Sequence, residues 1–98
     1  MTYNIIFVTK AKLELLESWE WYEDRQVGLG ERFKEEVYKA IQQIERNPKR
    51  YPIRKKPYYE KLVDVFPYLV IYRIEKREKI IVIVSIFHAK RNPRRKYK

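Results

Sequence analysis

The chain has 98 residues, the length of one small domain, and its 45% apolar content excludes a disordered tail protein. It has no cysteine and a single histidine, so disulfides and thiolate metal sites are excluded, and we expect no metal and no cofactor. The formal net charge is +10, and no apolar run approaches the ~20 residues of a membrane helix, so we expect a basic cytoplasmic protein without a membrane partner.

The first elements predicted are a short strand and a helix. Residues 3–8, YNIIFV, form a β-prone apolar run, and helical sequence follows from Lys10 to Asp24 with Thr9 as its N-cap. One apolar stripe runs along this helix, made by Leu15, Leu16, Trp19 and Tyr22. A glutamate at every third position marks an acidic, solvated side: Glu14, Glu17, Glu20 and Glu23.

A second helix is predicted over residues 29–46. Gly28 and Gly30 before it do not form a phosphate-binding fingerprint, because no strand precedes them and no third glycine follows. They are better explained as the connector of a helical hairpin. The apolar face of this helix has a 3.6-residue period and consists of Phe33, Val37, Ala40, Ile41 and Ile44. Pro48 ends the helix, since the residue before a proline avoids the α region.

The second half of the chain predicts a loop and three strands. The loop spans residues 48–60 and contains three prolines, and the strands are 61–66, 68–75 and 79–88, with a charged turn over 76–79. The last strand is apolar at nearly every position, as expected for a central strand covered on both faces. The predicted fold is α+β with the order β-α-α-β-β-β, a helical hairpin packed on one face of a mainly antiparallel four-stranded sheet. We expect one domain over residues 1–98.

Charge is distributed unevenly between the two halves. Residues 1–47 carry seven basic and nine acidic side chains, whereas residues 48–98 carry sixteen basic and four acidic ones. Residues 90–98 form a basic C-terminal tail. A half with a balance of +12 attracts nucleic acid or a strongly acidic protein partner, although a basic protein can also carry such a field incidentally.

Five short motifs give the chain a family resemblance over nearly its whole length. They are WYE at 21–23, GLGERF at 28–33, NPKRYP at 47–52, VFPYLVIYRI at 65–74 and IFHAKRNP at 86–93. In this order, and with this predicted layout, the chain resembles the RelE/ParE superfamily, the toxins of bacterial type II toxin–antitoxin systems. The details are most similar to the ParE-like branch.

The resemblance implies a toxin of the plasmid-stabilisation type that arrests growth and is held inactive by an antitoxin encoded beside it. RelE-like members cut messenger RNA in the ribosomal A site without a metal, using basic residues and often a tyrosine near the C-terminus. ParE-like members poison DNA gyrase and have no known nuclease chemistry. A RelE-like activity would therefore require groups in this sequence that support RNA cleavage.

Metal-free RNA cleavage needs a base for the 2′-hydroxyl, an acid for the 5′-oxygen and cations beside the phosphate. The candidate catalytic residues are His88, Arg91 and Tyr97. Basic residues that could bind nucleic acid or another target are Arg54, Lys61, Arg73, Lys90, Arg91, Arg94 and Arg95. Simpler explanations exist: His88 could only hydrogen-bond a neighbouring loop, and Arg73 could point to solvent.

One departure from the family pattern weakens the nuclease interpretation. Where relatives often carry an arginine before the Phe-Pro-Tyr triplet, this chain has Glu60 and Lys61, and lysine cannot grip a phosphate with two parallel hydrogen bonds. Around that triplet, Phe66 and Tyr72 are predicted to be core residues, whereas Tyr68 could be core or could stack a base. The aromatic residues of the basic loop, Tyr51, Tyr58 and Tyr59, suit either a base or a protein partner.

We therefore expect a toxin that inhibits DNA gyrase or another information-processing target. The alternatives are a ribosome-dependent mRNA endonuclease and a nucleic-acid-binding module without catalysis. The charge split also predicts that the antitoxin binds through an acidic segment, which offsets part of the basic half.

Overall fold

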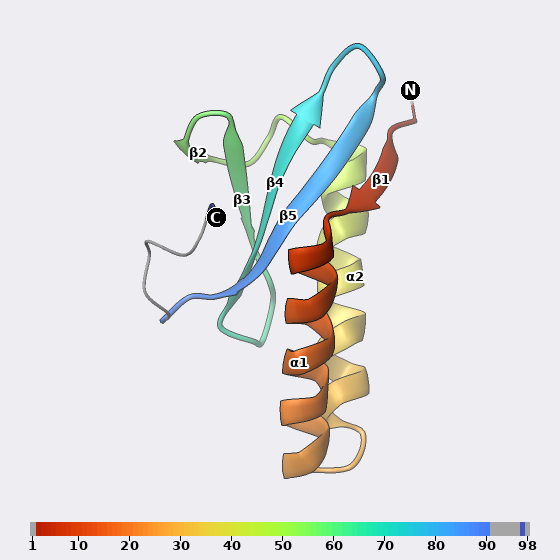
Figure 1. The fold of residues 1–98 in the computed structure, drawn as a ribbon, viewed down its shortest axis with the longest axis vertical. Coiled ribbons are helices and arrows are strands. Elements are labelled where there is room, and N and C mark those ends of the chain that lie inside the picture. Colours follow the sequence, from red (N-terminus) through yellow and green to blue (C-terminus); the bar gives the residue numbers. More distant parts are fainter. Residues whose placement is uncertain (1, 91–96, 98) are drawn as a thin grey trace.

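A computed structural model describes residues 2–90 and residue 97 of the chain. Along the chain, two helices follow the first strand and precede the four later strands (Figure 1). In chain order the elements are β1 (Asn4–Phe7), α1 (Thr9–Arg25), α2 (Leu29–Arg46), β2 (Ile53–Lys55), β3 (Tyr58–Leu62), β4 (Tyr68–Glu75) and β5 (Ile80–His88). The predicted bounds of α2 and β4 are confirmed, and the helices form the expected hairpin, which extends beyond the sheet (Figure 1).

The strands form one sheet in the order β1-β5-β4-β3-β2. The pairs from β5 to β2 are antiparallel, and β1 runs parallel to β5 with Asn4 beside Ile80 and Phe7 beside Ile83. The predicted α+β class and the mainly antiparallel sheet are confirmed. β5 is an interior strand, paired with β1 on one side and β4 on the other. The sheet has five strands where the sequence predicts four.

The additional strand lies in the segment predicted to be a loop. Residues 48–60 contain all of β2 and the start of β3, joined by a tight turn with a cis Lys56–Pro57 bond. The prolines of this segment favour a loop, but two consecutive aromatic residues with high β propensity follow them and extend the sheet. The strand predicted over 61–66 consequently begins three residues earlier and ends at Leu62.

Two expectations for α1 were wrong. Thr9 is the first helical residue instead of the N-cap, which is Val8, and no side chain caps this end. The glutamates are not uniformly solvated, because Glu14 and Glu23 are half-buried and hydrogen-bonded within the fold. A three-residue spacing drifts around a 3.6-residue helix, so these glutamates do not share one face.

The core lies between the helical hairpin and one face of the sheet, which we call the helix face. All five predicted apolar residues of α2 are buried there. Phe66 and Tyr72 are core residues as predicted, and Tyr68 joins them, with its ring 4.8 Å from that of Phe33. The buried Tyr72 hydroxyl donates a hydrogen bond to the Pro48 carbonyl at 2.6 Å, which ties the end of α2 to β4.

The turn between the helices is held by one carboxylate. Glu23 accepts hydrogen bonds from the backbone N–H groups of Gly28 and Gly30, each at 2.9 Å. Gly28 has φ of 92°, which favours glycine, and a Cβ at Gly30 would lie 2.5 Å from the Trp19 carbonyl oxygen. Both glycines therefore serve the helix connector, as the sequence indicates.

Glu14 completes the edge of β5 beyond the end of β1. Pairing of β1 with β5 stops at Phe7, and the next free edge of β5 faces α1. There the Glu14 carboxylate accepts hydrogen bonds from the Ser85 hydroxyl at 2.7 Å and the Ile86 N–H at 3.0 Å, both donors belonging to buried residues. A side chain thus replaces a missing strand.

Candidate functional site

His88 lies on the helix face, at the end of β5. It pairs with Tyr68 across the strands, and the two rings are 5.0 Å apart. The Tyr68 hydroxyl donates a hydrogen bond to Ser18 of α1 at 3.0 Å, and His88 faces a cavity of about 370 Å³ against that helix. The histidine therefore lies between sheet and helix.

One ring nitrogen of His88 accepts a hydrogen bond within the turn that follows β5. Its Nδ1 accepts a hydrogen bond from the Lys90 N–H at 3.1 Å, so the neutral ring carries its proton on Nε2. The one basic lone pair of the neutral imidazole is then already used. This arrangement agrees with the simpler prediction that His88 bonds a neighbouring loop.

Tyr97 lies on the opposite face of the sheet, which we call the outer face. Along β3, Tyr59 stacks on the core residue Tyr72, so alternation places Tyr58 and Glu60 on the other side. The Tyr97 hydroxyl donates a hydrogen bond to Glu60 Oε2 at 2.5 Å, and its ring stacks on Tyr58 with centroids 4.9 Å apart. Burial and the Glu60 carboxylate raise the pKa of Tyr97 to about 12.

The predicted cations are dispersed over several parts of the fold. Lys61 is on the helix face, where its ammonium lies 5.2 Å from the ring centroid of Tyr51, in a basic hollow with Arg46 and Arg50. Arg73 forms an ion pair with Glu75 of its own strand. Arg54 is exposed on β2.

The remaining cations are at the C-terminal end of the chain. Lys90 is exposed in the turn after β5. Arg91, Arg94 and Arg95 lie outside the described residues.

His88 and Tyr97 are consequently separated by the sheet. Each is held by its own partners, and the basic residues of the described chain do not converge on a point between them. Within residues 2–90 and 97 there is also no group of three residues that could hold a metal ion, and no helix there is long and apolar enough to cross a membrane.

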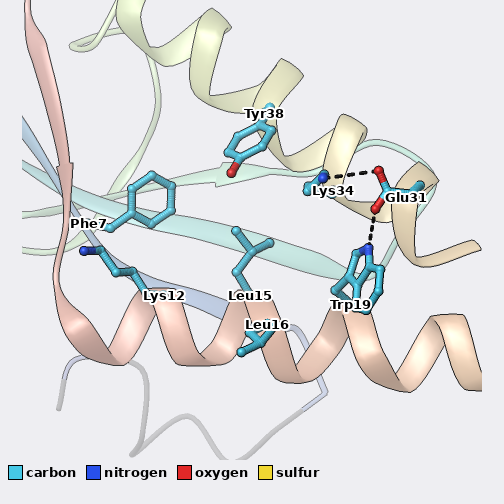
Figure 2. A pocket seen from close by; sticks show the side chains of 8 residues that line it. All are labelled: Phe7, Lys12, Leu15, Leu16, Trp19, Glu31, Lys34 and Tyr38. Carbon is cyan, nitrogen blue, oxygen red and sulfur yellow. Dashed lines mark hydrogen bonds and ion pairs between the residues drawn. The ribbon is translucent and has the colours of Figure 1, made fainter.

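A groove of about 410 Å³ lies along the outside of the helical hairpin, where α1, α2 and β1 meet (Figure 2). Its walls are mainly apolar, and three charged side chains stand at its rim. The lining residues are Phe7, Lys12, Leu15, Leu16, Trp19, Glu31, Lys34 and Tyr38. An exposed apolar groove with a polar rim is typical of a protein-binding site.

One end of the groove is fixed by a short polar network (Figure 2). The Trp19 indole N–H donates a hydrogen bond to Glu31 Oε2 at 2.7 Å, and Lys34 lies 3.2 Å from the other carboxylate oxygen. The indole hydrogen bond, followed by that of Lys34, lowers the pKa of the Glu31 carboxyl. These contacts hold the indole ring against the groove.

Sequence reasoning missed both the groove and the environment of Tyr97. The sequence predicts that Leu15, Leu16 and Trp19 belong to one apolar stripe covered by the sheet, but Leu16 is 51% exposed. The signal was present in Tyr38, which directly follows the buried Val37 and therefore begins a second apolar side on α2. No pattern along the chain places Tyr97 beside Glu60, because that contact joins two distant segments.

A protein-family model matches residues 5–93, and it describes the ParE toxin of the type II toxin–antitoxin system parDE. The chain belongs to the ParE toxin family. No curated protein sequence matches it. The family resemblance stated from the five motifs is thereby confirmed.

Solved structures share the fold of this ParE-family chain at low sequence identity. The chromosomal ParDE system of P. aeruginosa matches with a TM-score of 0.78 and 12% identity, covering 91% of this chain and 98% of the other. Isolated E. coli RelE gives 0.66 and 19%, covering 93% and 88%. The M. tuberculosis RelBE2 complex gives 0.64 and 22%, covering 90% and 99%. These similarities show the fold of the ParE-family toxin.

Proposed function

We propose that this ParE-family toxin arrests growth by binding a protein target, DNA gyrase, and that a cognate antitoxin with an acidic, partly apolar segment holds it inactive. The observation that carries the choice of target is the separation of His88 from Tyr97 by the sheet. A ribonuclease must bring a base and an acid to one phosphate, each within hydrogen-bond reach.

The charge at the position of the family arginine supports the same choice. Glu60 is 5% exposed and lies on the outer face, next to Tyr97. A buried carboxylate there opposes the negative charge that develops on a phosphate during cleavage. At this position the outer face therefore carries an anion where a metal-free nuclease needs a cation.

The target is tested by pulse labelling of DNA and protein synthesis just after induction of the chain alone, together with a supercoiling assay on purified gyrase. DNA synthesis should stop first, and the chain should inhibit supercoiling. His88→Asn should retain full growth arrest, whereas loss of a general base would lower the rate of cleavage about 10²- to 10⁴-fold. An early stop of protein synthesis that His88→Asn abolishes would show the ribosome-dependent nuclease instead.

The groove on the helical hairpin is the antitoxin site in this proposal. Its apolar walls suit one face of an amphipathic segment, and Lys12 and Lys34 at the rim suit acidic residues flanking that face. The basic second half of the chain attracts the same acidic segment over a longer range. Apolar contact and charge thus select one class of partner.

Two leucines of α1 provide a matched test of the groove. Leu16 lines it and is 51% exposed, whereas Leu13 is 53% exposed and does not line it. Leu16→Asp should weaken binding of the protein encoded beside this gene about tenfold to a hundredfold, the value of one buried leucine, and Leu13→Asp should not. Equal affinities of the two variants would exclude the groove as the antitoxin site.

A further inference from the structure

The contacts of Tyr97 define a small site on the outer face. Its floor is the ring of Tyr58, on which Tyr97 stacks with an interplanar angle of 22°. Its wall is the buried carboxylate of Glu60, which accepts the phenol hydrogen bond. The Lys55 ammonium lies 5.6 Å from the centroid of the Tyr97 ring.

These three contacts recognise general features of a flat aromatic group. The stacked ring selects a planar π system, the carboxylate oxygen selects an edge that donates a hydrogen bond, and the lysine favours an electron-rich face. A nucleobase has the same features, since every base is planar and its pairing edge carries N–H donors. Tyr97 is therefore a chemical substitute for a base at this site.

The surroundings favour a nucleic acid over other aromatic ligands. Arg54, Lys55 and Lys56 follow one another in and after β2, and all three are exposed beside the site. Arg54 is close enough for its charge to act on the Tyr97 hydroxyl. Cations next to a stacking ring are what single-strand binding sites combine, because the strand presents phosphates alongside its bases.

We propose that Tyr58, Glu60 and Lys55 form a binding site for one base of a single-stranded nucleic acid, and that Tyr97 occupies this site in the resting chain. The ring of Tyr97 covers the face of Tyr58 that a base would use, so the contact is autoinhibitory. The proposal does not depend on gyrase or the antitoxin, because its test measures only the binding of a strand to the purified chain.

The test is the affinity of the purified chain for a short labelled oligodeoxythymidine, measured by fluorescence anisotropy. Tyr97→Ala uncovers the ring of Tyr58 without changing any charge, so the strand should bind about fivefold more tightly or better. Tyr97→Phe keeps the ring on Tyr58 and should gain much less. Tyr97→Leu provides a second variant that removes the aromatic ring, and thermal melting checks that each variant is folded.

Two controls separate stacking from phosphate attraction. An abasic strand of the same length has the same phosphates, so Tyr97→Ala should bind it no better than the unchanged chain does. Tyr58→Leu added to Tyr97→Ala should remove the gain on oligodeoxythymidine. Equal affinities of Tyr97→Ala and the unchanged chain, or a gain that persists on the abasic strand or without Tyr58, would overturn the proposal. If Tyr97→Ala gained affinity for a tyrosine-containing peptide but not for oligodeoxythymidine, the result would overturn the proposal in favour of a protein ligand.

Discussion

Replacing Glu14 tests whether a side chain stabilises the edge of β5. The Glu14 carboxylate accepts two hydrogen bonds there, one from the Ser85 hydroxyl and one from the Ile86 N–H. Both donor residues are at most 1% exposed, so Glu14→Ala leaves them without an acceptor in a place that water reaches poorly. A hydrogen bond to a charged group contributes about 1.5–3 kcal/mol, and we expect the free energy of unfolding to fall by about 3 kcal/mol.

Urea denaturation followed by circular dichroism measures this change directly. The transition midpoint should fall without a change in the slope, because the folded state stays equally compact. For a domain of this size the loss corresponds to a decrease in melting temperature of about 12 °C. Glu14→Gln keeps an acceptor but loses the charge, and it should cost about 1 kcal/mol.

Glu17 is the matched control, since it lies three residues further along α1 and is exposed. Glu17→Ala should change the free energy of unfolding by less than about 0.5 kcal/mol. If Glu14→Ala were as stable as Glu17→Ala, the carboxylate would contribute nothing to the edge of β5, and the reasoning would be refuted.

Three further predictions concern packing and ionisation. Ala is a better helix former than Gly by about 1 kcal/mol. Gly30→Ala should nevertheless lower the melting temperature, because its Cβ would lie too close to a carbonyl of α1. A melting temperature higher than that of the unchanged chain would contradict this. Tyr97 should ionise near pH 12, measured as the difference between ultraviolet titrations of the unchanged chain and of Tyr97→Phe. Its contribution to stability is therefore complete below about pH 10 and is lost as the pH rises to about 12. Glu60→Gln should lower the pKa of Tyr97. Phe33→Ala should cost about 3–5 kcal/mol in urea, whereas Val27→Ala, at 91% exposure, should stay within about 0.5 kcal/mol.

The sequence predicts the helices better than the sheet edge. The bounds of α2 follow from the sequence because its apolar period, its glycine connector and Pro48 all agree. The sequence does not predict the β2–β3 hairpin, because its prolines favour a loop more strongly than Tyr58 and Tyr59 favour a strand. The pairing of β3 with β4, which decides the outcome, joins segments that are separate in the sequence.

The candidate site shows the same limit more sharply. His88 and Tyr97 are near in sequence, yet they lie on opposite faces of the sheet. Their partners, Tyr68 and Glu60, come from other strands, so only the strand register decides which side each one occupies. The residue types identify these groups as candidates, but they do not determine whether the groups lie close together in the fold.

The parallel pairing of β1 with β5 has a consequence for when the fold can form. β1 comes before every other strand of this sheet in the chain, and its partner β5 comes after all of them. Contacts between such distant segments form only after the intervening chain is available. A partly synthesised chain therefore lacks both the finished sheet and the groove wall that Phe7 of β1 supplies. The complete sheet and this wall of the groove should then form together, once β5 has been translated.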